Sequence, residues 1–270
     1  MTSTSGSQLQ SPRISRAAIV AHGRKDVHGA VDRVRALAGR LGVAVVDEPR
    51  DAELAIALGG DGTILRTLAH LLGSGTPVIG VNFGRVGFLA SIAPEQMEPC
   101  LERVFAGGYS VVELPTLELA LDGERHVAVN DVVATSSTLG RMIELAWAIG
   151  GEELGVVPCD GMICATPSGS TAYNLSNGGP VLVRGLDAMA VTFIAPHSLH
   201  ARPLVVPRGT TLTIRNQTAD VGCALLVDGH RVADLDPGAG TDVYLCEQRT
   251  LLATLPETSF FRRYREVFAS

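Results

Sequence analysis

The fold of this chain follows from Leu54-Ala55-Ile56-Ala57-Leu58-Gly59-Gly60-Asp61-Gly62-Thr63-Ile64-Leu65-Arg66-Thr67. The five leading apolar residues predict a short buried strand, and apolar residues at helical spacing from Ile64 onward predict an amphipathic helix. The three glycines place the turn between strand and helix at Asp61. Glycines remove the Cβ atoms that would hold a ligand away, and a helix N-terminus offers free N–H groups and a partial positive charge. The turn therefore indicates a phosphate site, formed by Gly59, Gly60, Gly62 and Thr63.

Asp61 is the unexpected residue in such a turn, because a carboxylate repels a phosphate. Its presence indicates chemistry, with the carboxylate facing a hydroxyl that is about to attack a phosphoryl group. The structural alternative is a turn between strand and helix in which Asp61 is only the helix N-cap. A second candidate phosphate contact is Arg85, in a loop after the next strand, for which a solvated arginine is the alternative.

Strands and helices alternate on both sides of this stretch. Strands are expected at 17–22, 43–46 and 77–81, and helices at 27–41 and 97–105. This alternation predicts a doubly wound parallel α/β sheet, whose ligand sites lie at the carboxyl ends of the strands. From Gly107 onward, short runs rich in Val, Ile and Thr between glycines and prolines predict a mostly β half. The expected parts are a disordered tail at 1–12, an α/β nucleotide-binding domain at 13–106, a β-rich domain at 107–255, and an amphipathic segment at 256–270 that docks back on the first domain.

Composition narrows the class of protein. The chain has 270 residues, 46% of them hydrophobic, and a formal net charge of -6, which argues against general binding of nucleic acid or of an anionic membrane. No apolar run reaches the ~18 residues that span a bilayer. The five cysteines are odd in number and scattered through apolar stretches, which favours a reducing cytoplasm. The only lysine is Lys25, so neither a Walker A motif nor a kinase-type strand lysine is present.

Two further segments carry polar groups. Pro167 through Asn174 combines a glycine turn with hydroxyls, an amide and an aromatic ring, which suit a base edge and its face. The alternative is a hydroxyl-capped helix start with Tyr173 in the core. Asn130-Asp131 ends the alternating run from His126 to Val129, and the pair fits either a ribose or base contact or a simple turn pair.

Taken together, these motifs resemble the NAD kinase family in their order and spacing. The matching segments are Gly59-Gly60-Asp61-Gly62-Thr63, Asn82-Phe83-Gly84 with Gly87-Phe88-Leu89, Asn130-Asp131, Asp160-Gly161, Pro167 through Tyr173, and Pro196-His197-Ser198-Leu199 with Arg202-Pro203-Leu204. The resemblance runs from about Leu54 to Val206. Diacylglycerol, sphingosine and phosphofructo-kinases share the glycine–aspartate motif, whereas the Gly-Ser-Thr-Ala-Tyr turn is much more specific.

The resemblance implies transfer of the terminal phosphoryl group of ATP, or of another donor, to the adenosine 2′-hydroxyl of NAD, with Asp61 as general base. The positions that match NAD contacts are Asp61, Gly62, Asn130, Asp131, Asp160, Thr171, Ala172, Tyr173, Asn174, Ser176, Ala195 and His230. Asp160 and Ala195 match contacts to the nicotinamide half, with Asp160 reaching in from a neighbouring subunit, which implies a homodimer or homotetramer. No carboxylate cluster with metal spacing accompanies Asp61, so Mg²⁺ is expected to arrive with ATP.

The chain departs from the family pattern at Ser168, where threonine is usual, and at Pro158, where many members have arginine. Two rival functions remain at this point. A lipid kinase of the diacylglycerol type shares the first motif and should lack the adenine-reading turn. A non-catalytic dinucleotide sensor has no use for Asp61.

Overall fold

The computed structural model describes residues 11–22, 25–84 and 87–268. Residues 1–10 of the predicted tail therefore lie outside the described residues, and so does Arg85. Contacts within the chain divide it into two compact units, one formed by residues 1–112 and 251–270 and the other by residues 113–250. Each unit is described by itself. No helix in the described part of the chain combines the length and the apolar character needed to cross a bilayer.

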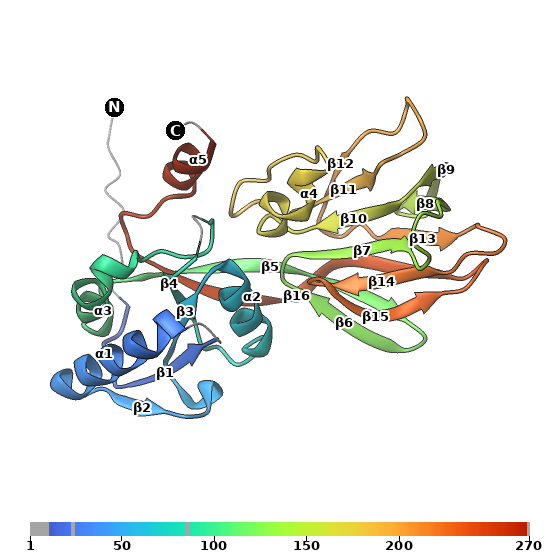
Figure 1. The fold of residues 1–270 in the computed structure, drawn as a ribbon. Helices are drawn as coiled ribbons and strands as arrows, with labels where there is room; N and C mark the ends of the chain where they lie inside the picture. The colour runs from blue at the N-terminus through green and yellow to red at the C-terminus, as the bar shows by residue number, and fades with distance from the viewer. Residues whose placement is uncertain (1–10, 23–24, 85–86, 269–270) are drawn as a thin grey trace. The chain divides into compact units, whose positions relative to one another are not determined.

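The first unit is a parallel α/β sheet with helices on both faces. Its elements are β1 (Arg16–Ala21), α1 (Lys25–Leu41), β2 (Ala44–Val46), β3 (Leu54–Gly59), α2 (Asp61–His70), β4 (Val78–Asn82), α3 (Met97–Phe105) and α5 (Phe260–Phe268), with single 3-10 turns at Pro49–Asp51 and Pro94–Gln96 (Figure 1). The strand order is β2-β1-β3-β4, with all pairs parallel. The end of β16 (Gly240–Thr254) extends this sheet, because Leu252 pairs with Val78 in parallel.

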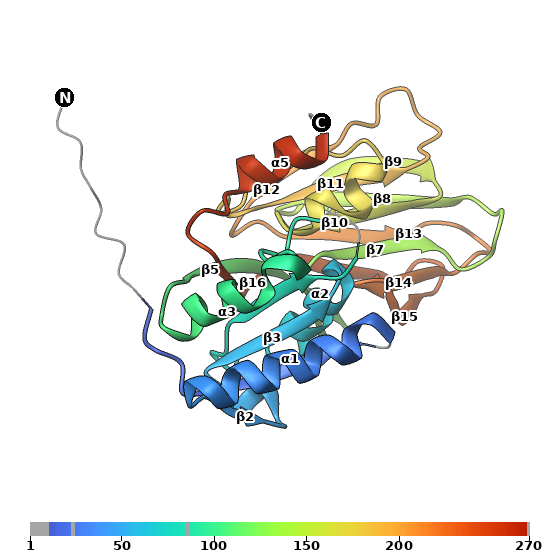
Figure 2. The ribbon, with the colours of Figure 1, turned by 60° about the vertical axis from the view of Figure 1, so that its left-hand side comes forward.

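Alternation along β3 decides which helix covers which face. Leu54, Ile56 and Leu58 belong to one core cluster together with apolar residues of α1 and α3. Figure 2 shows α1 running along the sheet beside β3. Ile64 of α2 instead reaches Gly80, whose neighbours Ile79 and Val81 face that first cluster. Since successive strand residues point to opposite faces, α2 covers the other side of the sheet. All six residues of β3 are buried, as expected for a central parallel strand.

The second unit is a pair of largely antiparallel sheets. Its elements are β5 (Ser110–Leu121), β6 (Glu124–Ala128), β7 (Asp131–Ser136), β8 (Ile143–Ile149), β9 (Glu152–Cys159), β10 (Gly161–Ala165), α4 (Tyr173–Ser176), β11 (Ala188–Ile194), β12 (Leu204–Pro207), β13 (Leu212–Asn216), β14 (Cys223–Val227), β15 (His230–Leu235) and most of β16, with a 3-10 turn at Gly169–Thr171. One sheet has the order β12-β11-β10-β7-β14-β15. The other contains β16-β13-β8-β9, and β5 pairs with both β16 and β6.

The core of the second unit lies between its two sheets. Trp147 of β8 meets Phe193 of β11 edge to face, with ring centroids 5.3 Å apart, so an aromatic pair joins the sheets. The predicted fold class, a parallel α/β part followed by a mostly β part with the C-terminal segment returning to the first, is confirmed.

Candidate functional site

In the first unit, Asp61 is the first residue of α2, directly after the carboxyl end of β3. The N-cap of α2 is Gly60, and no side chain caps this helix. The Asp61 carboxylate instead accepts hydrogen bonds from the backbone N–H groups of Phe88, at 2.7 Å, of Leu89, at 3.3 Å, and of Ala90, at 3.4 Å. The interpretation of Asp61 as a helix N-cap is therefore wrong.

Close backbone approach explains two glycines around this carboxylate. A Cβ added to Gly84 would lie 3.2 Å from the Cα atom of Gly60, and a Cβ added to Gly87 would overlap the Asp61 carboxylate. The N–H group of Phe83 donates to the carbonyl of Gly59 at 2.9 Å, which fastens the loop after β4 to the end of β3. A side chain at Gly87 would overlap the carboxylate, and one at Gly84 would make a tight contact, so the Gly-x-x-Gly spacing belongs to the turn at Asp61.

The predicted phosphate residues differ in their exposure. Gly62 is exposed in the first turn of α2, and the N–H group of the following Thr63 donates to the carbonyl of Gly60 at 2.9 Å. Gly59 is buried, and Thr63 is 8% exposed because its side chain lies against Gly59. Beside this turn, a pocket of about 390 Å³ is lined by Asn82, Phe83, Gly84, Ile92, Ala93, Pro94, Glu95 and Arg263.

In the second unit, Asp228 holds the Asn130-Asp131 segment. Asp228 and Gly229 form the tight turn between β14 and β15, with positive φ angles of 47° and 82°. The Asp228 carboxylate accepts hydrogen bonds from the N–H groups of Val129, Asn130 and Asp131 at 2.9, 2.7 and 3.2 Å. Its own N–H group donates to the carbonyl of Asp131 at 3.0 Å. The sequence did not predict these hydrogen bonds of Asp228, because an Asp-Gly pair indicates only a hairpin turn.

The turn after β10 packs directly on the same segment. The Thr166 hydroxyl donates to the carbonyl of Val129 at 2.7 Å, and its N–H group donates to the carbonyl of Asn130 at 2.9 Å. A Cβ on Gly169 would overlap the Asn130 backbone. Asn130, Asp131 and the glycine turn, which are far apart in the sequence, therefore form one surface.

Within that turn, Tyr173 is 46% exposed, and neither the 3-10 turn nor α4 has a side-chain cap. The alternative of a capped helix start with Tyr173 in the core is therefore wrong. Asn174 is buried, and its amide bonds internally to the carbonyls of Ser170 and Pro180 and to the Thr192 hydroxyl. Thr171 and Ala172 are partly exposed, and Ser176 is exposed at the end of α4.

The Asp131 carboxyl is only 6% exposed. Burial, and secondarily the neighbouring Asp228, raise the pKa of Asp131 to about 7. Burial also raises the pKa of Asp228, although the three N–H groups that it accepts act in the opposite direction. The segment thus carries a carboxyl that titrates near neutral pH.

The structure separates Asp160 and Ala195 from this surface within one chain. Asp160 precedes β10 and Ala195 follows β11, and the two lie side by side because Gly161 pairs with Ile194. Asp131 pairs with Ala165, at the far end of β10. Four strand residues of about 3.3 Å each lie between the two ends. His230 lies with Asn130 and Asp131, because its Nδ1 atom is 3.1 Å from the carbonyl of Asp228, which contacts both of those residues.

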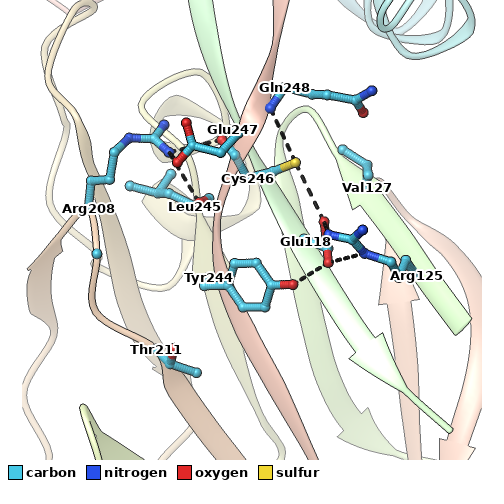
Figure 3. Close-up of a pocket in the computed structure, with 11 residues that line it drawn as sticks. Glu118, Arg125, Val127, Arg208, Thr211, Tyr244, Leu245, Cys246, Glu247 and Gln248 are labelled. Carbon is cyan, nitrogen blue, oxygen red and sulfur yellow. Dashed lines mark hydrogen bonds and ion pairs between the residues drawn. The ribbon is translucent and has the colours of Figure 1, made fainter. Parts of the chain in front are cut away.

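None of the predicted site residues lines a further pocket of about 700 Å³ in the second unit (Figure 3). Among its lining residues, Glu118 pairs with Arg125 through bonds of 2.5 and 2.7 Å and accepts a hydrogen bond from the Tyr244 hydroxyl. Burial alone would raise the pKa of Glu118, but the hydrogen bonds from Arg125 and Tyr244 outweigh it and lower that pKa.

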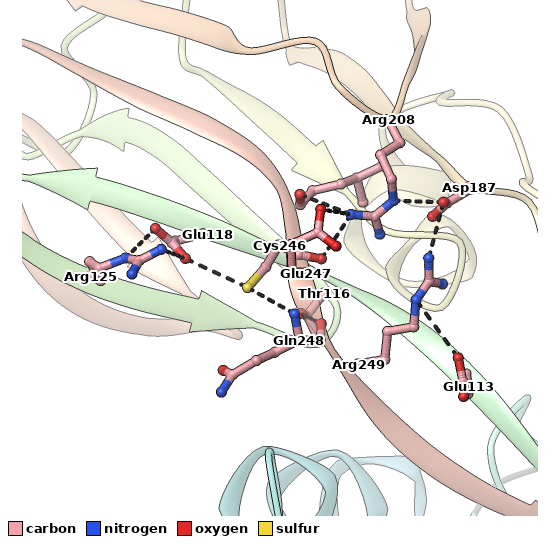
Figure 4. A network of polar contacts seen from close by, with 11 residues as sticks. Glu113, Thr116, Glu118, Arg125, Asp187, Arg208, Cys246, Glu247, Gln248 and Arg249 are labelled. Atoms are coloured by element: carbon pink, nitrogen blue, oxygen red, sulfur yellow. Dashed lines mark hydrogen bonds and ion pairs between the residues drawn. The ribbon is translucent and has the colours of Figure 1, made fainter.

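Arg208, which also lines this pocket, belongs to a second ion-pair network. Asp187 accepts from Arg208 at 2.6 Å and from Arg249 at 3.0 Å, and Arg208 also donates to the carbonyl of Cys246 at 3.0 Å (Figure 4). These contacts tie the start of β11 and the end of β12 to β16. The side chains of both networks are paired with one another, although the Nη2 atom of Arg208 is buried and has no hydrogen-bond partner among the described residues. Such internal pairing is typical of a structural role.

Comparisons with known proteins agree with one another. The model of the ATP-NAD kinase N-terminal domain matches residues 19–109, and that of the ATP-NAD kinase C-terminal domain matches residues 129–255. An NAD kinase of Heliobacterium modesticaldum is 39% identical over 225 residues, which cover 82% of this chain and 80% of the relative. An NAD kinase of Thermomicrobium roseum is 37% identical over 263 residues, 93% of this chain and 89% of the relative.

Two solved structures are similar to this fold. An NAD kinase from Archaeoglobus fulgidus in complex with ATP superposes with a TM-score of 0.79 and 28% identity, covering 94% of this chain and 97% of that one. Yeast NADH kinase complexed with NADH superposes with a TM-score of 0.84 at 22% identity, covering 95% of this chain and 88% of that one, and supports the fold alone.

Proposed function

Because the chain belongs to the ATP-NAD kinase family and is an NAD kinase, which phosphorylates NAD to NADP, we propose that Asp61 is its general base. Asp61 accepts the proton of the adenosine 2′-hydroxyl while that oxygen attacks the terminal phosphoryl group of the donor. In a loose transition state the hydroxyl proton leaves late, so the carboxylate mainly orients the nucleophile and needs no unusual basicity.

One observation carries this proposal: the Asp61 carboxylate is held by the backbone of Phe88, Leu89 and Ala90 while remaining partly exposed. A carboxylate offers about four lone-pair sites, and three N–H donors hold it because the N–H group of Leu89 is shared between both oxygens, so a substrate hydroxyl can be a fourth donor. Its place at the carboxyl end of β3 also fits the position of ligand sites in open α/β sheets. The N-terminal end of α2, where Gly62 is exposed, suits the phosphates of the donor.

For NAD, we propose that the surface built from Asn130, Asp131, Tyr173 and His230 takes the adenosine half. The half-exposed ring of Tyr173 supports stacking on adenine. Thr171, Ala172, Asn174 and Ser176 complete this part of the site, with Asn174 acting from inside the turn. Asp160 and Ala195 lie at the opposite end of β10, which supports their meeting the nicotinamide half bound to another subunit of a homodimer or homotetramer.

We propose that ATP is a donor and that Mg²⁺ arrives with its triphosphate. The described residues contain no group of three or more His, Cys, Asp or Glu side chains placed to hold a metal ion, so the phosphates would supply most of its ligands. When bound, the ion would neutralise charge on the transferred phosphoryl group. The scattered free cysteines support a cytoplasmic location.

The alternative of a diacylglycerol-type lipid kinase predicts no adenine-reading turn. The C-terminal family model spans 129–255 and so includes that turn. A dinucleotide sensor would bind NAD without turnover.

A single assay tests these proposals together. Purified protein is incubated with Mg²⁺-ATP and NAD, and NADP is measured with an NADP-specific dehydrogenase. We expect NADP to form with the unchanged protein. With Asp61→Asn, the rate of NADP formation should fall to a small fraction of the native rate. Binding of NAD without NADP formation would favour the sensor, and near-native turnover of Asp61→Asn would remove Asp61 from the mechanism.

A further inference from the structure

The C-terminal helix α5 contacts the segment that holds the Asp61 carboxylate. The ring of Phe88 lies against two rings of α5, Phe260 and Phe268, with centroids 5.8 and 5.7 Å apart. The guanidinium of Arg263 donates to the carbonyl of Ala90 at 2.7 Å. The segment Gly87–Ala90 is therefore attached at both ends to a helix that begins 170 residues or more further along the chain.

The same two residues face Asp61 from the other side. Phe88 gives the shortest hydrogen bond to the carboxylate, at 2.7 Å, and the N–H group of Ala90 gives another, at 3.4 Å. Phe88 is thus held by its ring and donates through its backbone, and Ala90 is held by its carbonyl and donates through its N–H group. Any shift of α5 would be passed to Asp61 through one short stretch of backbone.

The rest of α5 contributes little to the core of the first unit. None of its residues is fully buried, and Phe261 is 68% exposed. Among the described residues, the core cluster of this unit includes Ala253 and Leu255 but no residue of α5. The side chain of Arg263, by contrast, is only 19% exposed. The helix is therefore attached mainly around Phe88 and Ala90 rather than by a broad apolar face.

We propose that Arg263 and the rings of Phe260 and Phe268 are positioning groups for the general base. They fix the segment Phe88–Ala90, and the N–H groups of that segment orient the Asp61 carboxylate toward the substrate hydroxyl. This inference rests on the proposed role of Asp61. A displacement of about 1 Å at a reacting group costs roughly 100-fold in rate, so a loosened segment should lower turnover while both substrates still bind.

The test compares Arg263→Ala with Arg265→Ala, a matched control on the same helix. Arg265 is exposed, and the described part of the chain shows no contact from it to Gly87–Ala90. We expect Arg263→Ala to lower kcat by about 10- to 100-fold, with the KM values for NAD and for ATP changed less than about two-fold. Arg265→Ala should stay near native. Arg263→Lys should recover much of kcat, because an ammonium group can still donate to the carbonyl of Ala90.

Two outcomes of this comparison would overturn the proposal. Arg263 also lines the pocket beside Gly84, so a raised KM for ATP with unchanged kcat would identify it as a donor contact instead. Native kinetics in Arg263→Ala would leave α5 without a role in catalysis. If Arg263→Ala is poorly folded, Phe268→Leu, which keeps apolar packing but loses the ring contact, is measured in its place.

A double variant separates this inference from the proposed function. If Arg263 acts through Asp61, adding Arg263→Ala to Asp61→Asn should leave the residual turnover unchanged. A further loss equal to that of the single variant would show an independent role and overturn the inference while leaving Asp61 as base. Near-native turnover of Asp61→Asn alone would defeat the proposed function itself. Hydrogen exchange gives a readout free of catalysis: the amides of Phe88–Ala90 should exchange faster in Arg263→Ala and at the native rate in Arg265→Ala.

Discussion

Asp131→Asn should change how the stability of the protein depends on pH. The pKa of Asp131 is raised to about 7, chiefly by burial, whereas the ordinary value is about 3.9. Between these two values the folded state keeps the proton and the unfolded state loses it. The free energy of unfolding therefore falls as the pH rises from about 4 to about 7, and above that range this group contributes no further change. Asparagine has a similar shape and does not ionise, so it removes the dependence.

The size of the effect follows from the shift. About three pKa units correspond to about 4 kcal/mol, and more than half of that is lost between about pH 5 and about pH 8. Urea unfolding of both proteins at these two pH values measures it: the stability of Asp131→Asn relative to the unchanged protein should rise by about 2 to 3 kcal/mol across the interval. A difference in free energy of unfolding that stays constant with pH would refute the reasoning. It would mean that Asp131 is ionised in the folded protein at every pH in the interval.

The remaining predictions concern turnover, affinity, stability and assembly. Asp61→Asn should lower turnover by ~10²–10⁴ and cost about 1 kcal/mol of stability, because its amide nitrogen would face the N–H groups of Leu89 or Ala90; kinetics and thermal midpoints measure the two effects. Tyr173→Ala should raise the KM for NAD more than that for ATP, and equal changes would count against stacking. Asp228→Ala should cost about 2–4 kcal/mol in urea unfolding, because three backbone N–H groups lose their acceptor. Light scattering should show at least a dimer, and an active monomer would contradict contact by Asp160 across subunits.

Local patterns were sufficient for most of the first unit. The predicted strand and helix around Gly59 and Asp61 correspond to β3 and α2, because continuous apolar runs and glycine turns report burial and chain reversal directly. The amphipathic run at 260–268 corresponds to α5. The expected helix at 97–105 is α3, which accepts Pro99 within its first turn, where the missing N–H group has no helix partner.

The β half was harder to predict because its strands are not uniformly buried. Most residues of β9 are exposed, so Glu152–Cys159 shows no clear alternation of apolar and polar residues. The strand β16 runs from Gly240 to Thr254 and pairs with different strands along its length. The polar run Glu247-Gln248-Arg249-Thr250 in the middle of β16 interrupts the apolar signal of the strand. Pairing partners of this kind depend on the whole sheet rather than on the strand itself.

The contacts that define the candidate site join a side chain to a distant backbone, and such contacts have no sequence period. Asp61 was recognised by its glycines, yet its partners are N–H groups of residues 88 to 90, which any amino acid except proline would supply. In the segment from Gly87 to Ala90, the glycine is the residue type that the contact with Asp61 requires, because a side chain at Gly87 would overlap the carboxylate. The same holds for Asp228, because an Asp-Gly pair in the sequence does not indicate that its carboxylate accepts hydrogen bonds from three backbone N–H groups. Residues that act through the backbone therefore require a structure to be found, whereas residues that act through their own chemistry, such as Asp61 and Tyr173, can be proposed from the sequence.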